Sequence, residues 1–351
     1  MNSVVKNPLD QVCPVSVEEL GSDVHCHTLQ AGRPPLFIEP RSDALRDRAC
    51  FQAWTERVRP ILDRLIVEHG GIVLRGFPIE ETADFGNLAE LFPAFASGYA
   101  GGVAPRSAIS GRVMEATRLA APVRLTLHSE MAYMRDYPKR IAFFCRRAAP
   151  VGGETIIGDM RTLVDELPAE LVSKIERLGI RTTRNYGAKS DQLDQSVEIM
   201  ESIGWNVAFG TDDPQKVEAL CAERGLEPLW NDNGTLTVFN RTDPFVIHPQ
   251  TGRRLYRSIL HVYRADKRPE GENTELYEAI RKTQQHPSGT FLGNGEELSV
   301  QEVEAFEAII DRHTLCWPWR NGDVMILDNL QVWHGRNPYE GPRDVQVALL
   351  D

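Results

Sequence analysis

The chain has 351 residues, of which 39 are Lys or Arg and 50 are Asp or Glu, so its formal charge is −11. This acidic balance argues against a nucleic-acid-binding surface, which would be basic and clustered. The apolar fraction of 42% is typical of a globular protein. The six cysteines form no CxxC pair, and we see neither a secretory signal nor an apolar run long enough to span a membrane. We therefore expect a cytoplasmic protein without nucleic-acid or membrane partners.

The first part of the chain predicts a leader and then a helical region. Residues 1–33 are expected to form an irregular leader. Apolar side chains recur at helical spacing over about 49–68, and Gly70-Gly71 ends that run. A buried strand at 72–75 and a short helix near 82–92 follow.

Short β-rich runs dominate the rest of the chain, and Pro and Gly separate them. No βαβ rhythm, GxGxxG or Walker A motif indicates a nucleotide-binding fold. The pattern predicts a mainly β fold with helices (α+β), namely a jelly-roll barrel that carries helices on its outside. We expect one domain over 1–351, with an insertion at about 187–230 that acts as a lid. The expected strands are 123–127, 141–147, 154–158, 179–186, 235–239, 244–248, 254–260, 324–327, 331–333 and 345–349, and the expected helices are 160–176, 214–224, 274–284 and 301–313.

Two segments carry residues that indicate metal chemistry. His128 and Glu130 stand two apart on an extended segment, so both side chains project to the same side. Alone, this pattern is most often a solvated pair. Near the C-terminus, His334 ends an apolar strand and stands nine residues before Arg343. Two imidazoles and one carboxylate form the facial triad of non-haem Fe(II) oxygenases. A guanidinium nearby is suited to a carboxylate cosubstrate, which it binds through two parallel hydrogen bonds.

With these motifs the sequence resembles the TauD/TfdA-like superfamily of Fe(II)/2-oxoglutarate oxygenases. Within that superfamily it is most similar to the clavaminate synthase-like and syringomycin-type amino-acid hydroxylases. The matching blocks run in order from about residue 71 to the C-terminus. They are Val73–Phe77, Leu127–Tyr133, Ile141–Cys145, Pro150–Thr155, Gly158–Arg161, His248–Gly252 and His334–Arg343.

The resemblance implies a double-stranded β-helix in which His128, Glu130 and His334 hold Fe(II). It also implies that Thr155 and Arg343 bind the distal carboxylate of 2-oxoglutarate, and that O2 is the second cosubstrate. The expected reaction is hydroxylation of an unactivated C–H bond in natural-product biosynthesis. The substrate would be an amino acid, free or tethered to a carrier protein. Desaturation, cyclisation and epoxidation need the same triad, whereas chlorination is disfavoured because halogenases of the superfamily lack the carboxylate.

Substrate contacts are expected mainly where the sequence departs from its relatives. The segment 255–261 replaces one that lies near the substrate side in the family. A buried zwitterion needs paired charges, so we expect a cation for the substrate carboxylate and acidic residues of the lid for an amine. A salt bridge or an acidic surface loop is the simpler interpretation of the same residues. The candidates are Arg257, His261, Arg124, Asp191 and Asp194.

Two other classes of function remain open from the residues alone. A non-catalytic barrel that binds a small molecule would have no need of the complete triad together with Arg343. A zinc hydrolase can also use two His and one carboxylate. The chain lacks HExxH, and a hydrolase would leave Arg343 and Thr155 without a role.

Overall fold

The computed structural model describes residues 12–96, 108–116, 119–189, 204–261 and 288–351. Its largest element is a nine-stranded sheet in the order β1-β2-β3-β4-β18-β8-β21-β6-β5. Neighbouring strands are antiparallel except for β3 and β4, which are parallel. The strands are β1 (Cys13–Val15), β2 (Val24–Thr28), β3 (Leu36–Pro40), β4 (Gly71–Leu74), β18 (Val324–Asp328), β8 (Arg140–Arg147), β21 (Asp344–Leu350), β6 (Val113–Glu115) and β5 (Ala108–Ser110).

A smaller sheet lies opposite, in the order β17-β10-β19-β7. It consists of β17 (Thr314–Leu315), β10 (Thr155–Asp159), β19 (Val332–Arg336) and β7 (Leu125–His128). Apolar side chains of the two sheets meet in one cluster, which includes Phe143, Met325 and Val347 from the large sheet and Ile157 and Val332 from the small one. The two inner faces therefore enclose a common core.

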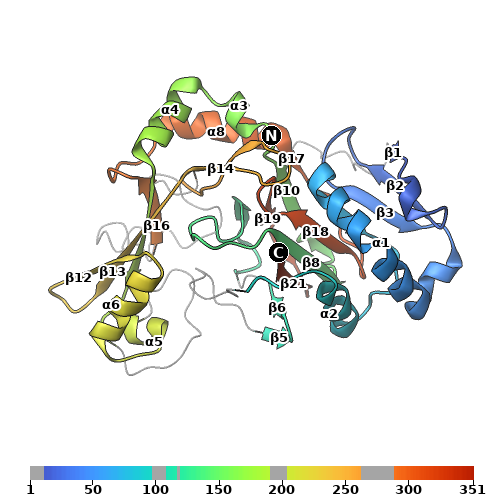
Figure 1. Cartoon of the computed structure of the whole chain (residues 1–351), viewed down its shortest axis with the longest axis horizontal. Helices are drawn as coiled ribbons and strands as arrows, with labels where there is room; N and C mark the ends of the chain where they lie inside the picture. The colour runs from blue at the N-terminus through green and yellow to red at the C-terminus, as the bar shows by residue number, and fades with distance from the viewer. Residues whose placement is uncertain (1–11, 97–107, 117–118, 190–203, 262–287) are drawn as a thin grey trace.

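Helices cover the outer face of each sheet (Figure 1). The helices α1 (Arg48–His69) and α2 (Thr82–Glu90) pack on the large sheet, where residues such as Trp54 and Phe85 share one apolar cluster with the alternate strand residues Phe144 and Ile326. The helices α3 (Leu163–Glu166), α4 (Ala169–Leu178) and α8 (Val300–His313) cover the small sheet. Alternation along each strand separates the core-facing from the helix-facing side chains.

A further layer lies on the far side of the molecule from α1 (Figure 1). Its sheet has the order β12-β13-β11-β16, with α5 and α6 beside it. Its own apolar cluster includes Trp205, Val217 and Leu236. The elements are β11 (Ile180–Tyr186), α5 (Trp205–Phe209), α6 (Pro214–Glu223), β12 (Glu227–Trp230), β13 (Leu236–Thr242) and β16 (Ser288–Leu292). The remaining elements are the strand pairs β14 (Phe245–Ile247) with β15 (Arg254–Tyr256) and β9 (Val151–Gly152) with β20 (Tyr339–Glu340), and the 3-10 helices η2 (Glu18–Leu20) and η3 (Asp43–Arg46).

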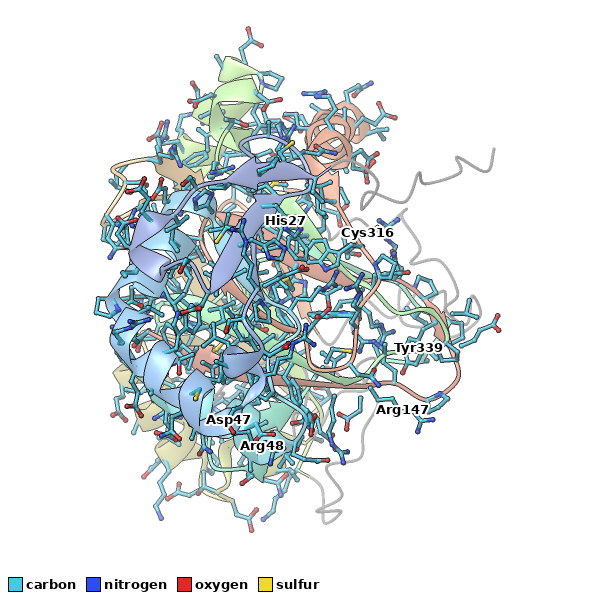
Figure 2. The ribbon with its side chains drawn as sticks, turned by 90° about the vertical axis from the view of Figure 1, so that its right-hand side faces the viewer. His27, Asp47, Arg48, Arg147, Cys316 and Tyr339 are labelled. Carbon is cyan, nitrogen blue, oxygen red and sulfur yellow. The ribbon has the colours of Figure 1, made fainter. Side chains whose placement is uncertain are left out.

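The mixed helix and sheet content predicted from sequence is confirmed, with some differences in detail. The segment expected as an irregular leader contains β1 and β2, which extend the large sheet. Strand β2 was not predicted because its sequence is polar. In the structure its polar side chains have partners: His25 pairs with Glu39, and His27 stacks on Phe37 (His27 is labelled in Figure 2). The helix expected over 160–176 is broken into α3 and α4, and Pro168 is the N-cap residue of α4. The helix expected over 274–284 lies outside the described residues. No helix of the described part has the length and apolar character that a membrane span requires.

Candidate active site

Strand register brings the expected metal ligands to the core-facing side of the small sheet. His334 on β19 is directly opposite His128 on β7 and Ile157 on β10. Directly paired residues share a face of the sheet, so both imidazoles point toward the common core. The neighbouring Trp333 points the other way and packs among the helices on the outer face. Thr155 and Arg336 are also paired. They lie two residues further along their strands and therefore on the same inner face.

His128, Glu130 and His334 form one compact group. Their ligand atoms lie within 4.8 Å of one another, and no other such group of His, Cys, Asp or Glu occurs among the described residues. The two imidazole centroids are 4.5 Å apart, and Nε2 of His334 is 3.7 Å from Oε2 of Glu130. Glu130 and His334 are buried, whereas His128 is partly exposed. The sequence prediction that these three residues meet agrees with this geometry.

The donor set fits a divalent transition metal. Nδ1 of His128 is 2.8 Å from the carbonyl oxygen of Thr126, and since a carbonyl only accepts, Nδ1 is the protonated nitrogen. That tautomer leaves Nε2 with a lone pair for a metal. The distance of 3.7 Å between His334 and Glu130 is too long for a hydrogen bond. Imidazole and carboxylate ligands of this number leave coordination positions open for other molecules.

A glycine allows the two histidine strands to approach each other. A Cβ at Gly335 would lie 2.4 Å from the carbonyl oxygen of Leu125, which no side chain can tolerate. The register between β19 and β7 also shifts at this point, between His334 and Arg336. The glycine that follows His334 in the sequence is therefore a steric requirement for bringing β7 beside β19.

Arg343 lies close to Thr155 through a short backbone connection. Its Nε donates to the carbonyl oxygen of Gly153 at 2.9 Å, two residues before Thr155. Its terminal nitrogens have no hydrogen-bond partner among the described residues. Burial, and then the neighbouring Arg336, lower the pKa of Arg343 to about 10. The guanidinium remains charged at neutral pH, and its surroundings favour an anion beside it.

Thr155 and the preceding glycines complete this end of the site. Trp319 Nε1 donates to the buried Thr155 hydroxyl at 3.2 Å, so the hydroxyl proton is left to donate to another group. Gly153 has φ +73°, and a Cβ there would lie 3.1 Å from Cδ of Arg343. Only glycine combines this backbone conformation with such close packing against the arginine.

Arg336 differs from Arg343 although both lie against Tyr339 (labelled in Figure 2), at 5.0 and 5.6 Å from the ring centroid. The terminal nitrogens of Arg336 donate to three backbone carbonyls, those of Leu119, Ala120 and Val123, at 2.7–2.9 Å. These bonds hold the segment that leads into β7. Arg336 therefore has a structural function, with its buried Nε left without a partner among the described residues, whereas both terminal nitrogens of Arg343 are available.

Among the described substrate candidates, Arg257 is the one that contacts the segment following Glu130. Arg257 is buried, donates to the carbonyl oxygen of Met134 at 2.6 Å and lies 4.3 Å above the Tyr137 ring. Both partners belong to the segment that follows Glu130 along the chain. His261 is stacked between Trp333 and Phe306 on the outer face of the small sheet, away from His334. Arg124 is exposed at the start of β7, and Asp191 and Asp194 lie outside the described residues.

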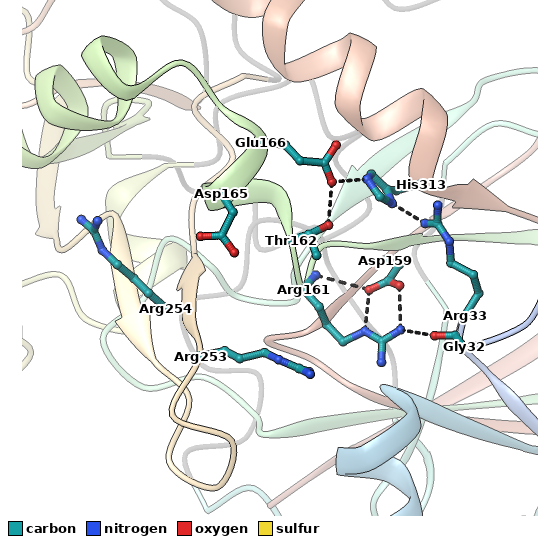
Figure 3. Close-up of a pocket in the computed structure, with 10 residues that line it drawn as sticks. All are labelled: Gly32, Arg33, Asp159, Arg161, Thr162, Asp165, Glu166, Arg253, Arg254 and His313. Atoms are coloured by element: carbon teal, nitrogen blue, oxygen red, sulfur yellow. Dashed lines mark hydrogen bonds and ion pairs between the residues drawn. The ribbon is translucent and has the colours of Figure 1, made fainter.

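A second group of ionisable side chains lines a pocket of about 570 Å³ beside α3 and the C-terminal end of α8 (Figure 3). Arg161 pairs with Asp159 through two hydrogen bonds of 2.7 Å, and Glu166 accepts from His313 at 2.6 Å. Burial alone would raise the pKa of Glu166, but hydrogen bonds from Thr162, Arg312 and His313 outweigh it and lower the pKa to about 2. Most of the charge here is matched within the protein. The lining residues are Gly32, Arg33, Asp159, Arg161, Thr162, Asp165, Glu166, Arg253, Arg254 and His313.

Two residues around the site have contacts that the sequence did not reveal. Trp319 donates to Thr155, and this bond distinguishes it from Trp317 and Trp333. Asn329 follows β18 and is wholly buried against Ser129 and Glu130. In the sequence, Asn329 is marked only by being part of the polar pair Asp328-Asn329 at the end of an apolar strand. Such a pair is equally typical of an ordinary turn.

Known proteins resemble the chain over most of its length. A family profile described as "Taurine catabolism dioxygenase TauD, TfdA family" matches residues 48–349. The dapdiamide synthesis protein DdaC of Enterobacter agglomerans is 29% identical over 295 residues, which cover 83% of this chain and 84% of DdaC. A clavaminate synthase-like protein of Arabidopsis thaliana is 27% identical over 326 residues, covering 90% and 93%. Among solved structures, PvcB of Pseudomonas aeruginosa has 14% identity and a TM-score of 0.49, with coverage of 100% and 94%.

Proposed function

The chain belongs to the TauD, TfdA family of dioxygenases, and from that premise we propose that it hydroxylates a C–H bond of an amino acid or of a carrier-bound aminoacyl group. The protein is an Fe(II)- and 2-oxoglutarate-dependent dioxygenase. The position of the iron site is supported by one observation, which is that the ligand atoms of His128, Glu130 and His334 lie close together. We assign these three residues as the iron ligands and the two facing sheets as the double-stranded β-helix of the family.

When bound, Fe(II), 2-oxoglutarate and O2 supply the oxidising chemistry, and the protein supplies position and environment. The Thr126 carbonyl orients the His128 ring, so that Nε2 is the nitrogen that would hold the metal. The core side chains around His334, such as Phe143 at 5.0 Å between centroids, limit the access of water. Burial of Glu130 and His334 keeps the charge of the ligand set in a region of low polarity, where its attraction for a cation is strong.

We assign the distal carboxylate of 2-oxoglutarate to Arg343 and Thr155. The guanidinium has its terminal nitrogens available, and the Thr155 hydroxyl has a proton to donate. The planar guanidinium fits a carboxylate through two parallel bonds, which a lysine cannot reproduce. The lowered pKa of Arg343 supports the same assignment, because an anion relieves the cost of burying the cation beside Arg336.

We assign Arg257 to the substrate carboxylate. Burial lowers the pKa of Arg257, an effect that Tyr137 and the exposed Asp243 oppose, and no carboxylate of the described residues lies within ion-pair distance of it. A buried cation without a close ion pair is costly, so an anionic group of the substrate would find a favourable partner there. The likeness to a dapdiamide synthesis protein and to a clavaminate synthase-like protein favours a substrate of natural-product metabolism. Closure of a lid over this site, by residues within 187–230, is part of the same proposal.

The proposal predicts that the right substrate accelerates 2-oxoglutarate turnover. Succinate release is measured with Fe(II), 2-oxoglutarate and a panel of free amino acids, and separately with aminoacyl groups loaded on a carrier protein. Stimulation above the rate without substrate, together with a product heavier by one oxygen atom, is the expected result. Stimulation by an organic acid that lacks an amino group, with none by any amino acid or aminoacyl group, would contradict the proposed substrate class.

A further inference from the structure

One buried side chain, that of Asn329, binds both backbone groups of Glu130. The Glu130 backbone N–H donates to Oδ1 of Asn329 at 2.7 Å, and Nδ2 of Asn329 donates to the Glu130 carbonyl oxygen at 3.0 Å. The amide therefore contacts both the N–H and the C=O of the same residue. Its second N–H donates to the carbonyl oxygen of Pro138 at 2.8 Å. Asn329 has no exposed surface.

The neighbouring Ser129 is held by the same residue. Its hydroxyl lies 2.6 Å from the backbone carbonyl oxygen of Asn329, to which it donates, and 3.3 Å from Oδ1. A primary amide has two N–H donors and one oxygen with two lone pairs. In Asn329 both donors are used and the oxygen has two neighbouring donors, so the orientation of the amide is determined by its partners. Aspartate has the same shape but no N–H to offer the two carbonyls.

The backbone directly after Glu130 needs such support. Met131 has φ 55°, in the left-handed region that residues other than glycine rarely adopt. Fixing the N–H and C=O of Glu130 fixes the direction of its Cα–Cβ bond, and hence where the carboxylate can reach. The hydrogen bonds to Asn329 thus act at the point where the chain turns sharply away from the ligand.

Asn329 is itself firmly attached to the turn between β18 and β19. The backbone N–H of Asn329 donates to the Lys139 carbonyl oxygen at 2.9 Å. The backbone N–H of the preceding Asp328 donates to the Gly70 carbonyl oxygen at 3.0 Å. The Asp328 carboxylate accepts from Nε2 of the buried His248 at 2.9 Å. From this turn β19 continues directly to His334. One anchored turn therefore determines the positions of two of the three assigned ligands.

We propose that Asn329 is a positioning residue for the metal centre, which sets the Glu130 carboxylate relative to His334 before the metal binds. This inference depends on the proposed function only in that Glu130 is a metal ligand. Loss of a hydrogen bond that supports a metal ligand typically lowers metal affinity about ten- to a hundredfold. A smaller but measurable loss is expected for Ser129→Ala, because the Ser129 hydroxyl holds the backbone carbonyl of Asn329 and so the position from which the Asn329 amide reaches Glu130.

The test is anaerobic titration of the metal-free, full-length protein with Fe(II), in competition with a coloured chelator. The variants are Asn329→Ala, Asn329→Asp and Ser129→Ala, and folding is followed by circular dichroism and thermal unfolding. The matched control is Gln331→Ala. Gln331 lies in the same turn, is equally buried and donates to Val67 O and Asp328 Oδ2, but it makes no contact with Glu130. We expect both Asn329 variants to bind Fe(II) at least about tenfold more weakly than the control at similar stability.

The outcomes separate the inference from the proposed function. A wild-type protein that binds no Fe(II) overturns the function and the inference together. If the wild type binds Fe(II) and folded Asn329 variants bind it equally well, only the positioning role is overturned. An equal loss in Gln331→Ala also overturns it, because general destabilisation would then explain the effect. If neither Asn329 variant folds, Ser129→Ala decides, and unchanged affinity in that variant contradicts the proposal.

Discussion

The metal-ligand group and the charged pocket of Figure 3 both gather ionisable side chains, but they match charge differently. In the pocket, hydrogen-bond donors face carboxylates: Arg161 donates to Asp159, and His313 donates to Glu166. In the metal-ligand group, three potential donors of lone pairs, two imidazoles and a carboxylate, face one another. The charges of the first arrangement are mostly matched within the protein. On our assignment of the iron ligands, the second is completed by Fe(II).

The same contrast separates Arg336 from Arg343. Three carbonyls occupy the terminal nitrogens of Arg336, whereas Arg343 uses only Nε within the described part of the chain. Arg343 therefore has unused hydrogen-bond donors beside the buried Arg336. Such unused donors are a better indicator of a bound ligand than the charge of the arginine itself. Substitutions in the two regions should therefore have unequal effects, with the largest in the metal-ligand group.

Removing an imidazole from the metal-ligand group should abolish Fe(II) binding and leave the fold intact. His334→Ala and His128→Ala are expected to lower Fe(II) affinity by well over a hundredfold, beyond the roughly ten- to hundredfold loss for a supporting contact. Metal content after dialysis against Fe(II) under nitrogen measures this, and circular dichroism checks the fold. His313→Ala, which removes an imidazole from the charged pocket, is the control. Wild-type iron content in either ligand variant would show that the assignment is wrong.

Arg343→Ala should raise the apparent KM for 2-oxoglutarate roughly ten- to a hundredfold, because a hydrogen bond to a charged group contributes about 1.5–3 kcal/mol. Arg343→Lys should recover part of this loss, since lysine keeps the charge but not the planar geometry. Arg147→Ala is the matched control, because Arg147 is exposed on the adjacent strand β8. Initial rates of succinate release against 2-oxoglutarate concentration give the KM. Wild-type cosubstrate dependence in Arg343→Ala would transfer the role to another residue.

Arg257→Met should weaken the response to the amino-acid substrate and leave the KM for 2-oxoglutarate unchanged. Loss of a charged hydrogen bond predicts a roughly tenfold or larger rise in substrate KM. The comparison is with Arg254→Met, since Arg254 is partly exposed and already pairs with Glu176. If both variants respond to substrate as the wild type does, Arg257 is not the carboxylate partner.

Glu166→Gln should leave catalysis unchanged and have a small, pH-dependent effect on stability. The pKa of Glu166 is lowered from 4.5 to about 2, so its ion pairs stabilise the fold above pH 4.5 and lose that effect as the pH falls toward 2. The carboxylate is largely solvated, and we expect a difference of at most about 1 kcal/mol at pH 7. Urea unfolding at pH 7 and pH 3 measures it. A difference that grows on acidification would contradict the sign of this linkage.

Much of the site could be predicted because its residues are close in sequence or follow a strong pattern. His128 and Glu130 are two residues apart on one strand end, and Gly335 directly follows His334. Asn329 could not be predicted, because its contacts with Ser129 and Glu130 span about 200 residues and arise only from sheet register. His261 was a substrate candidate because a buried histidine and a pocket histidine look alike in sequence. Its ring packs instead between Phe306 and Trp333.

The central claim is that His128, Glu130 and His334 hold Fe(II) while Arg343 holds 2-oxoglutarate beside it. Anaerobic visible spectroscopy tests both assignments in one measurement, because 2-oxoglutarate bound to Fe(II) gives a weak charge-transfer band that neither gives alone. We expect the band in the wild type, its absence in His334→Ala, and its appearance in Arg343→Ala only at much higher 2-oxoglutarate concentration. A wild-type protein without the band, or an unchanged band in His334→Ala, would contradict the account.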